Sequence, residues 1–363
     1  MLDVSLDKVS FQHGRSGFRI DDLTCVFPRS SITAIVGAAG SGKSTLLRLA
    51  SGHHKVKAGT IRIGSRDATL LPPRERPLFS SAFDTIPPPR WSAQHVLIAA
   101  LRERKLDLED RRVEFDLAVD KWRLSPLLER KLSTLSPAER LRLRLSQIET
   151  LRPAVFVADR FLQDASTDEL PELIREIGSS LRMIGSTVIT EISTLDELSM
   201  CDRAVVMDAG RIIQSGTPKD VYDRPINEAS ARALGDVNTI PIVIRGSSVE
   251  SPIGDWSVAS PPFEGEGVAL ARPGDFSVVS PGEDSDFIFS IEQASFRRGE
   301  WLLRGFLTGA HLLTVTLSAS MDIHKGKLLP LRYDPHRWTL VPKRHSGIER
   351  GPTGAVPTLR DSR

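Results

Sequence analysis

The stretch Gly37-Ala38-Ala39-Gly40-Ser41-Gly42-Lys43-Ser44-Thr45 follows an apolar run at 32–36 and precedes a helical pattern at 45–50. It fills the pattern G-x-x-x-x-G-K-[ST] in the order strand, glycine loop, helix. In such a loop, backbone N–H groups turn inward around a polyphosphate, and the helix N-terminus adds partial positive charge. An ordinary glycine–serine turn is the alternative, but the flanking strand and helix argue against it. We expect Lys43 to reach the outer phosphates and the Ser44 hydroxyl to ligate Mg²⁺.

The bulk properties describe a soluble globular chain. It has 363 residues, is 40% hydrophobic and 26% charged, and carries a net charge of +2. That length fits two domains, and the near-neutral charge predicts no nucleic-acid partner. Cys25 and Cys201 are too few for a disulfide framework, which favours reduced, cytosolic thiols. The chain begins without the form of a signal peptide, and no apolar run approaches the ~20 residues that span a bilayer, so any membrane role would need a partner.

The first two thirds of the chain alternate between strand-like and helical patterns. Such alternation predicts a parallel sheet covered by helices. Between about residues 90 and 150 the pattern becomes rich in Leu, Arg and Glu at helical spacing, which predicts a helical subdomain. The expected strands are 2–11, 18–26, 32–36, 58–64, 154–158, 186–190 and 203–207.

Within the helical stretch, residues 138–151 form a basic amphipathic pattern in which Arg140, Arg142 and Arg144 alternate with leucines. Two readings are open: a nucleic-acid surface or a solvated helix face. We favour the solvated face, because a charge run on a helix is usually exposed to water.

The last third has a different style. From residue 237, short β-like runs are separated by Gly, Pro and Ser, which predicts a separate all-β, barrel-like domain at 237–345. Residues 346–363 are rich in Gly, Pro, Ser and Arg and are expected to be a disordered tail.

Three more segments complete a recognisable set. The apolar run 155–158 ends at Asp159, as a strand that supplies a carboxylate to the Mg²⁺ shell of a nucleotide does. Leu135-Ser136-Pro137-Ala138-Glu139 lies between this strand and the glycine loop, and 200–218 follows with a hairpin-like pattern. With these motifs, residues 1–235 resemble the ATP-binding subunits of ABC importers, in the branch for sugars, glycerol phosphate, polyamines and iron.

The resemblance implies a fold and a domain plan. It implies an α/β, RecA-like P-loop NTPase core at 1–236, with its helical subdomain, followed by a small all-β domain of OB or TOBE type. The segments 222–227 and 234–238 resemble the link into the TOBE domain in that branch. Residues 268–275 resemble a sequence that recurs within TOBE domains.

The resemblance also implies ligands and partners. Such subunits bind ATP and Mg²⁺ between the glycine loop of one subunit and the signature sequence of a second ATP-binding subunit. They dock on membrane permease subunits at the inner, cytoplasmic face of the cell membrane, and a periplasmic solute-binding protein feeds the permease. The implied nucleotide-binding residues are Gly37, Ala38, Ala39, Gly40, Ser41, Gly42, Lys43, Ser44, Thr45, Asp159 and His13, with Ser44 and Asp159 on Mg²⁺ and His13 in place of the residue that stacks on adenine.

Three positions depart from the family pattern. Arg160 stands where the catalytic glutamate follows Asp159, Glu191 stands at the switch histidine, and Phe83 stands at the Q-loop glutamine. Arginine is always charged and has no acceptor, so it cannot orient or deprotonate a water. Loss of a general base typically costs about 10²–10⁴-fold in rate. The sequence therefore predicts impaired hydrolysis at this site.

The signature segment, Leu135 to Glu139, departs as well. Ser136-Pro137-Ala138-Glu139 is an S-x-x-E capping box with proline at the first helical position. Pro137 has no N–H to offer a partner's phosphate, and Glu139 places a carboxylate near it. We expect this helix to cap itself; the alternative is that Ser136 alone still suffices for the signature contact.

Arg160 and Glu191 are expected at the same edge of the sheet, which predicts a salt bridge within about 4 Å between them. Three functions remain open: an importer subunit that binds MgATP but hydrolyses it poorly, a nucleotide-sensing regulatory pseudo-ATPase, or an ordinary active importer ATPase. The last needs a water-orienting group from elsewhere, for which Asp164 is the nearest candidate.

Overall fold

The computed structural model describes residues 2–14, 17–80, 88–104, 106–166, 168–192, 194–279, 284–297, 299–307, 312–318 and 323–343. The chain divides into two compact units, Met1–Asp236 and Val237–Arg363. Phe83 and the tail expected at 346–363 lie outside the described residues. No helix in the described part of the chain is long and apolar enough to cross a membrane.

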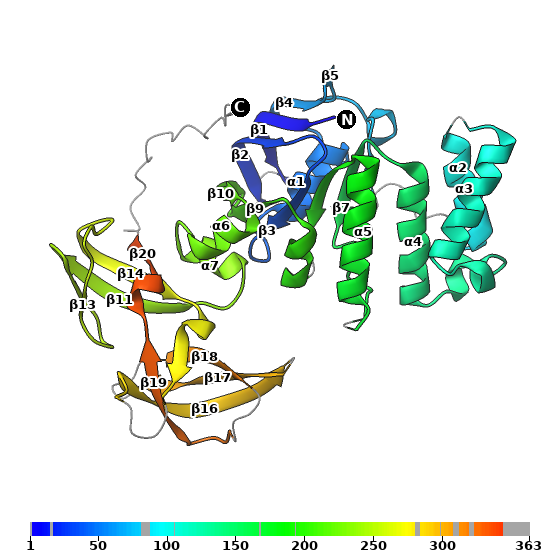
Figure 1. Cartoon of the computed structure of the whole chain (residues 1–363). Coiled ribbons are helices and arrows are strands. Elements are labelled where there is room, and N and C mark those ends of the chain that lie inside the picture. The colour runs from blue at the N-terminus through cyan, green and yellow to red at the C-terminus, as the bar shows by residue number, and fades with distance from the viewer. Residues whose placement is uncertain are drawn as a thin grey trace. The chain divides into compact units, whose positions relative to one another are not determined.

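The centre of the first unit is a six-stranded sheet in the order β10-β9-β3-β8-β7-β6. Figure 1 labels β3, β7, β9 and β10 of this sheet. Five strands are parallel, and β10 is antiparallel to β9. Because parallel strands run in one direction, the carboxyl ends of β3, β7 and β8 meet at one edge of the sheet. The strands are β3 (Ile32–Val36), β6 (Phe79–Ser80), β7 (Val155–Asp159), β8 (Thr187–Glu191), β9 (Arg203–Asp208) and β10 (Arg211–Gly216).

Both faces of this sheet are buried, which explains why its strands read as continuous apolar runs. Side chains alternate along each strand, so β7 sends Phe156 and Ala158 into one core and Val155 and Val157 into the other. The first core includes apolar residues of α2 to α5, and the second those of α1 and an antiparallel sheet.

That antiparallel sheet has the order β2-β1-β4-β5. It packs its apolar face, including Leu6, Ile20 and Ile61, into the core that α1 shares. The four strands are β1 (Val4–Gln12), β2 (Arg19–Phe27), β4 (Ala58–Ile63) and β5 (Arg66–Asp67).

Apart from α1, the helices of the first unit begin at side-chain caps or at proline. Ser92, Asp107 and Ser136 accept the backbone N–H three residues ahead at the starts of α2, α3 and α4. These three helices form the predicted helical subdomain, beside α5 (Figure 1). The helices are α1 (Lys43–Ser51), α2 (Ala93–Glu103), α3 (Leu108–Lys121), α4 (Pro137–Leu151), α5 (Leu170–Ile184), α6 (Pro218–Asp223) and α7 (Glu228–Ala233), with 3₁₀ turns Pro73–Glu75, Ser125–Leu127, Leu132–Thr134 and Leu195–Met200.

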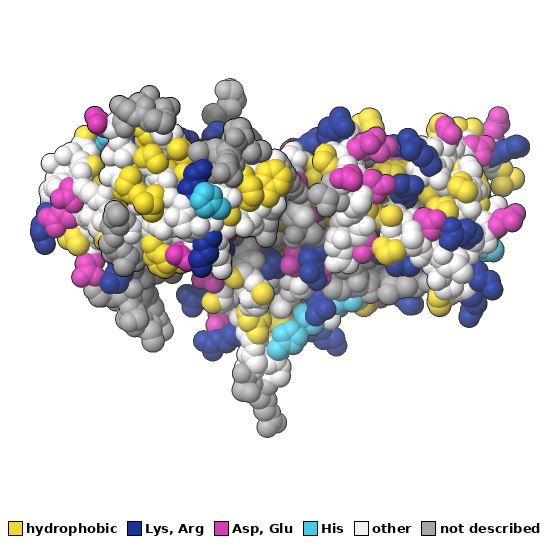
Figure 2. Space-filling model, turned by 90° about the horizontal axis from the view of Figure 1, so that it is seen from below, with side chains coloured by type: hydrophobic (Ala, Val, Ile, Leu, Met, Phe, Trp, Pro, Cys, Tyr) yellow, Lys and Arg dark blue, Asp and Glu magenta, His cyan; other side chains and the backbone are white. Residues whose placement is uncertain are grey.

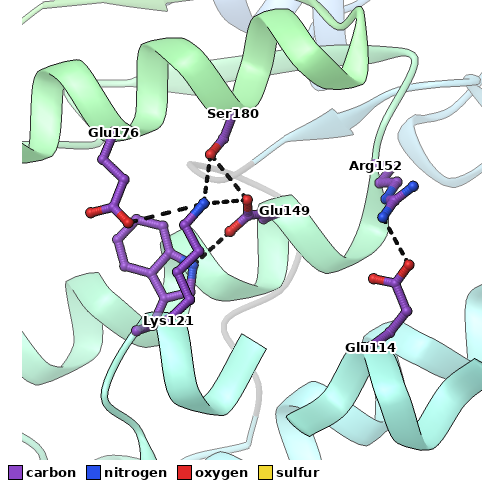
Figure 3. Close-up of polar contacts among 7 residues, drawn as sticks. Glu114, Lys121, Glu149, Arg152, Glu176 and Ser180 are labelled. Atoms are coloured by element: carbon purple, nitrogen blue, oxygen red, sulfur yellow. Dashed lines mark hydrogen bonds and ion pairs between the residues drawn. The ribbon is translucent and has the colours of Figure 1, made fainter. Parts of the chain in front are cut away.

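A polar network joins α3, α4 and α5 (Figure 3). Lys121 at the end of α3 pairs with Glu149 of α4 at 2.6 Å and donates to Ser180 of α5 at 2.9 Å. Trp122 donates its indole N–H to Glu149 at 2.8 Å. Burial alone would raise the pKa of Glu149, but the bonds from Lys121, Trp122 and Ser180 outweigh it and lower that pKa.

The surface of the helical subdomain carries both signs of charge. Figure 2 shows Lys and Arg interspersed with Asp and Glu there, without a continuous basic stripe. Of the arginines on α4, Arg142 pairs with Glu169 at 2.6 Å, and Arg144 is partly buried. The expected solvated face is thus only partly open to water.

The second unit is all-β, as the sequence predicts. Its two sheets have the orders β13-β12-β11-β14-β20 and β15-β19-β16-β17-β18, and both contribute to one apolar core. The strands are β11 (Asn238–Arg245), β12 (Ser248–Glu250), β13 (Trp256–Ser257), β14 (Gly265–Ala271), β15 (Phe276–Val278), β16 (Phe287–Arg297), β17 (Glu300–Leu307), β18 (Leu312–Ser318), β19 (Leu328–Tyr333) and β20 (Thr339–Pro342), with 3₁₀ turns Pro273–Asp275 and Pro335–Arg337.

Candidate functional site

The glycine loop joins β3 to α1 at the carboxyl edge of the sheet, as the motif predicts. Gly37 and Gly42 have φ values of 145° and 106°, in the region that favours glycine. A Cβ at Gly37 would lie 2.2 Å from the Met207 carbonyl, and one at Gly42 would lie 2.6 Å from the Phe18 ring. No side chain caps the N-terminus of α1, which leaves its first N–H groups free for an anion.

Lys43, the first residue of α1, holds the loop together in this structure. Its ammonium donates to the carbonyls of Gly37 and Ala38, both at 2.8 Å. The same ammonium lies 3.7 Å from the Glu191 carboxylate, an ion pair whose two side chains are only 12% and 11% exposed. The cation expected to meet the outer phosphates therefore has a carboxylate beside it.

Glu191 also engages the residue expected to ligate magnesium. The Ser44 hydroxyl donates to Glu191 Oε2 at 3.0 Å. Glu191 ends β8, which lies directly beside β3, and this adjacency brings its carboxylate to the start of α1. Glu191 thus contacts both Lys43 and Ser44.

The predicted salt bridge between Arg160 and Glu191 is wrong. The two residues do meet, but through the backbone: the Arg160 N–H donates to the Glu191 carbonyl at 2.8 Å. Arg160 has a φ of 44°, so the chain turns sharply after β7, and its side chain is 54% exposed. Its guanidinium lies 3.6 Å from Asp159 instead. The Glu191 carboxylate contacts the Lys43 ammonium and the Ser44 hydroxyl at the start of α1.

Asp159 has the character of a metal ligand. It ends β7 opposite Glu191 of β8, and its Oδ1 is buried, makes no hydrogen bond among the described residues and has the Arg160 guanidinium 3.6 Å away. A buried acceptor of this kind is costly unless something satisfies it. Magnesium typically takes one or two carboxylates together with phosphates and waters. Asp159 and Ser44 fit such an ion, although the described residues hold no group of three or more His, Cys, Asp or Glu arranged for a metal.

The predicted capping box at the start of α4 is confirmed. Ser136 Oγ accepts the Glu139 N–H at 3.2 Å, and Glu139 Oε2 accepts the Ser136 N–H at 2.7 Å. Arg130 adds an ion pair to Glu139 at 2.7 Å. The bond from the Ser136 backbone, followed by the contact with Arg130, lowers the pKa of Glu139. This segment, with Leu135, Pro137 and Ala138, therefore has one of its end N–H groups bound to its own serine.

His13 lies in a small aromatic cluster. Its exposed ring meets Phe11 and His54 edge-on, with centroids 4.9 and 5.0 Å apart. Burial, and then the nearby charge of His13, lower the pKa of His54. A hollow of about 600 Å³ borders the glycine loop; it is lined by Gln12, Gly17, Phe18, Arg19, Gly40 and Ala209.

Sequence reasoning missed Phe18, the aromatic residue of that hollow. Its ring packs on Gly42 of the loop, whereas His13 does not line the hollow. The available signal was an aromatic residue five positions after His13. The charge of Asp164, the candidate for orienting water, acts to raise the pKa of Arg144 on α4, although burial lowers that pKa. No described contact joins Asp164 to the glycine loop.

Comparison with known proteins agrees with the motifs. Residues 20–161 match the family described as "ABC transporter". The chain is 29% identical over 240 residues to the Fe(3+) ions import ATP-binding protein FbpC of Streptomyces avermitilis, covering 66% of this chain and 70% of the relative. It is 25% identical to the sulfoquinovosyl glycerol transport ATP-binding protein SmoE of Agrobacterium fabrum over 358 residues, 93% of this chain and 96% of the relative.

Solved structures agree on the fold. An ATP-binding subunit of an ABC transporter superposes with a TM-score of 0.54 at 18% identity, covering 60% of this chain and 91% of the other. A dimeric ATP-binding cassette in a post-hydrolysis state with ADP and Pi gives 0.52 at 16% identity, covering 59% and 98%. The predicted P-loop fold is confirmed. Residues 20–161 are similar to ABC transporters, and the relatives include import ATP-binding proteins.

Proposed function

We propose that this chain is the ATP-binding subunit of an ABC importer, which binds MgATP but hydrolyses it slowly or not at all at its own site. The observation that carries the proposal concerns Arg160, just after β7, and Glu191, at the end of β8. Arg160 follows Asp159, and Glu191 contacts the glycine loop. The loop itself retains every group that phosphate binding needs.

The binding half of the proposal rests on α1. The uncapped N–H groups of α1 and the Lys43 ammonium converge on the loop and would hold the phosphates of ATP. Ser44 and Asp159 would hold Mg²⁺, which neutralises phosphate charge when bound. The hollow lined by Phe18 would take the base; His13, the residue proposed from the motif, lies beside Phe11 and His54.

The proposal of slow hydrolysis rests on Arg160 and Glu191, neither of which would supply a general base at the carboxyl edge of the sheet. A general base must accept a proton from water within hydrogen-bond reach. Arg160 has no acceptor on its side chain, and the Glu191 carboxylate already accepts from Ser44 and pairs with Lys43. With these contacts, neither side chain would be free to accept a proton from an attacking water.

The proposed partners rest on the start of α4 and on the similarity to import ATP-binding proteins. The capping box binds the Glu139 N–H at the start of α4, and Pro137 has no N–H to offer. A second, catalytically intact ATP-binding subunit would supply the cleavage step in a heterodimer. The pair would dock on permease subunits at the cytoplasmic face of the membrane, served by a periplasmic solute-binding protein. The second unit would be the TOBE-type domain of such subunits.

Turnover and binding of the purified full chain test the proposal. We expect saturable binding of MgATP with release of phosphate well below about 1 s⁻¹, the lower end of typical enzyme rates. Lys43→Ala sets the background for both measurements. Turnover near 1 s⁻¹ or above, absent from Lys43→Ala, would contradict impaired hydrolysis. Co-purification from native membranes with permease chains and a second ATPase supports the importer; recovery of the chain alone favours a regulatory pseudo-ATPase.

A further inference from the structure

We propose that Glu191 is a specificity-determining residue that opposes the terminal phosphate of a nucleoside triphosphate, so that the site favours a nucleoside diphosphate. The inference rests on the proposed function, because it concerns the same glycine loop. It goes further by assigning to one side chain the discrimination between two nucleotide forms.

The contacts of Glu191 carry the argument. One oxygen lies 3.7 Å from the Lys43 ammonium, and the other accepts the Ser44 hydroxyl at 3.0 Å. In the loop motif these two groups serve the outermost phosphate and its magnesium ion. The Glu191 carboxylate therefore lies beside the groups that a terminal phosphate must use.

Charge makes this position unfavourable for a third phosphate. Glu191 is only 8% exposed, so water screens its charge poorly. Asp159 is its register partner on β7, which places a second carboxylate at the same edge. The compensating Arg160 guanidinium is 54% exposed and lies by Asp159 rather than by Glu191. A γ-phosphate would meet these two carboxylates and a single half-buried ammonium, that of Lys43.

A diphosphate escapes most of this repulsion. The backbone N–H groups of the loop and of α1 would bind the inner phosphates. These donors belong to the loop and to α1, and not to the end of β8, where Glu191 lies. A nucleotide that ends at the second phosphate can leave Glu191 on Lys43 and Ser44. A triphosphate must displace that carboxylate or accept a like charge beside it.

The bonding pattern also supplies a matched variant. The Ser44 hydroxyl donates to Glu191, so the carbonyl oxygen of a glutamine at this position can accept the same bond. Glu191→Gln therefore removes the charge and preserves the shape. Glu191→Asp keeps the charge and withdraws it by one methylene. Glu169→Gln is the control, because it removes a carboxylate that pairs with Arg142 instead.

The experiment measures dissociation constants of ATP and ADP for the four full-length proteins by calorimetry, with EDTA and again with Mg²⁺. Thermal unfolding of each variant checks that it is folded. With EDTA we expect Glu191→Gln to tighten ATP at least about tenfold relative to ADP, which corresponds to about 1.4 kcal/mol. Glu191→Asp should shift the ratio in the same direction by less, and Glu169→Gln should leave it unchanged.

Other outcomes of the same experiment distinguish failure of this inference from failure of the proposed nucleotide binding. Equal tightening of ATP and ADP in Glu191→Gln, or no change in either, overturns the discrimination while nucleotide binding stands. Loss of ATP binding in both folded Glu191 variants overturns it as well, since Glu191 would then support binding. A wild-type chain that binds neither nucleotide with Mg²⁺ overturns the proposed function itself and this inference with it.

Discussion

Asp159 and Glu191 stand opposite each other at the ends of the parallel strands β7 and β8, and each lies beside a different cation. The Asp159 carboxylate lies near the exposed guanidinium of Arg160, and the Glu191 carboxylate pairs with the half-buried ammonium of Lys43. The two acids are therefore not equivalent. One retains a buried oxygen without a donor among the described residues, and the other is already engaged with α1.

Lys43→Ala should weaken nucleotide binding by about 100-fold or more, equivalent to about 2.7 kcal/mol. The ammonium is the one cation in contact with the loop carbonyls in the described structure. Titration with a fluorescent ATP analogue measures the change. Lys219→Ala is the control, because that exposed lysine of α6 pairs with Asp223 instead. A loss below threefold would contradict the role of Lys43.

Asp159→Asn should remove most of the Mg²⁺ dependence of ATP binding. The buried Oδ1 of Asp159 suits a cation, and an amide lacks the charge that holds Mg²⁺. We expect magnesium to strengthen ATP binding to the wild-type chain at least about tenfold and to have little effect on Asp159→Asn. Calorimetry with and without EDTA measures both. An unchanged magnesium dependence in the variant would show that the ion lies elsewhere.

Ser136→Ala should destabilise the first unit by about 1 kcal/mol, since the Glu139 N–H loses its acceptor at the start of α4. Denaturant unfolding followed by circular dichroism measures the difference. Ser136→Asp should retain most of the stability, because aspartate is also a good helix cap. Equal losses in both variants would mean that the cap does not stabilise α4.

Glu149→Gln should cost about 1.5–3 kcal/mol near neutral pH, because the carboxylate accepts from Lys121, Trp122 and Ser180. The folded pKa of Glu149 is lowered from 4.5, so its charged form adds stability above about that pH and loses it as the pH falls. The difference between wild type and variant should therefore shrink in acid.

Denaturant unfolding at several pH values tests this behaviour of Glu149. Glu176→Gln is the matched control, since Glu176 lies 4.0 Å from the same lysine and makes the weaker contact (Figure 3). A difference between wild type and Glu149→Gln that grows toward low pH would have the wrong sign for this network.

Arg76→Lys should destabilise the first unit by about 1.5–3 kcal/mol. The buried guanidinium donates to the carbonyls of Leu49 and Ala50 at the end of α1 and to Leu71. A lysine ammonium cannot reproduce this planar arrangement of donors. Thermal unfolding measures the loss, and Arg74→Lys on the exposed turn nearby should have little effect.

The local features of the site could be predicted well. The glycine loop, the apolar strand that ends at Asp159 and the capping box of Ser136 and Glu139 each depend on residues within a few positions of one another. Phe18 was missed because its contact with Gly42 joins segments far apart in the chain. The tertiary contact carries information that spacing does not.

The Arg160–Glu191 prediction failed for a related reason. It assumed that opposite charges at neighbouring strand ends would pair. Arg160 instead follows a turn with a φ of 44°, and its side chain is largely exposed. Backbone geometry, rather than charge, decided that the two residues meet only through the bond from the Arg160 N–H to the Glu191 carbonyl.

The sequence by itself determined the class of fold, the phosphate loop and the self-capped helix, because these follow from apolar periodicity and from hydrogen bonds between near neighbours. Only the tertiary structure decided what Glu191 does. Its strand lies between β3 and β7, and that order brings the carboxylate to Lys43 and Ser44. Glu191 is 147 positions from Ser44 and 148 positions from Lys43 in the chain. They meet because the order of strands in the folded sheet brings them together.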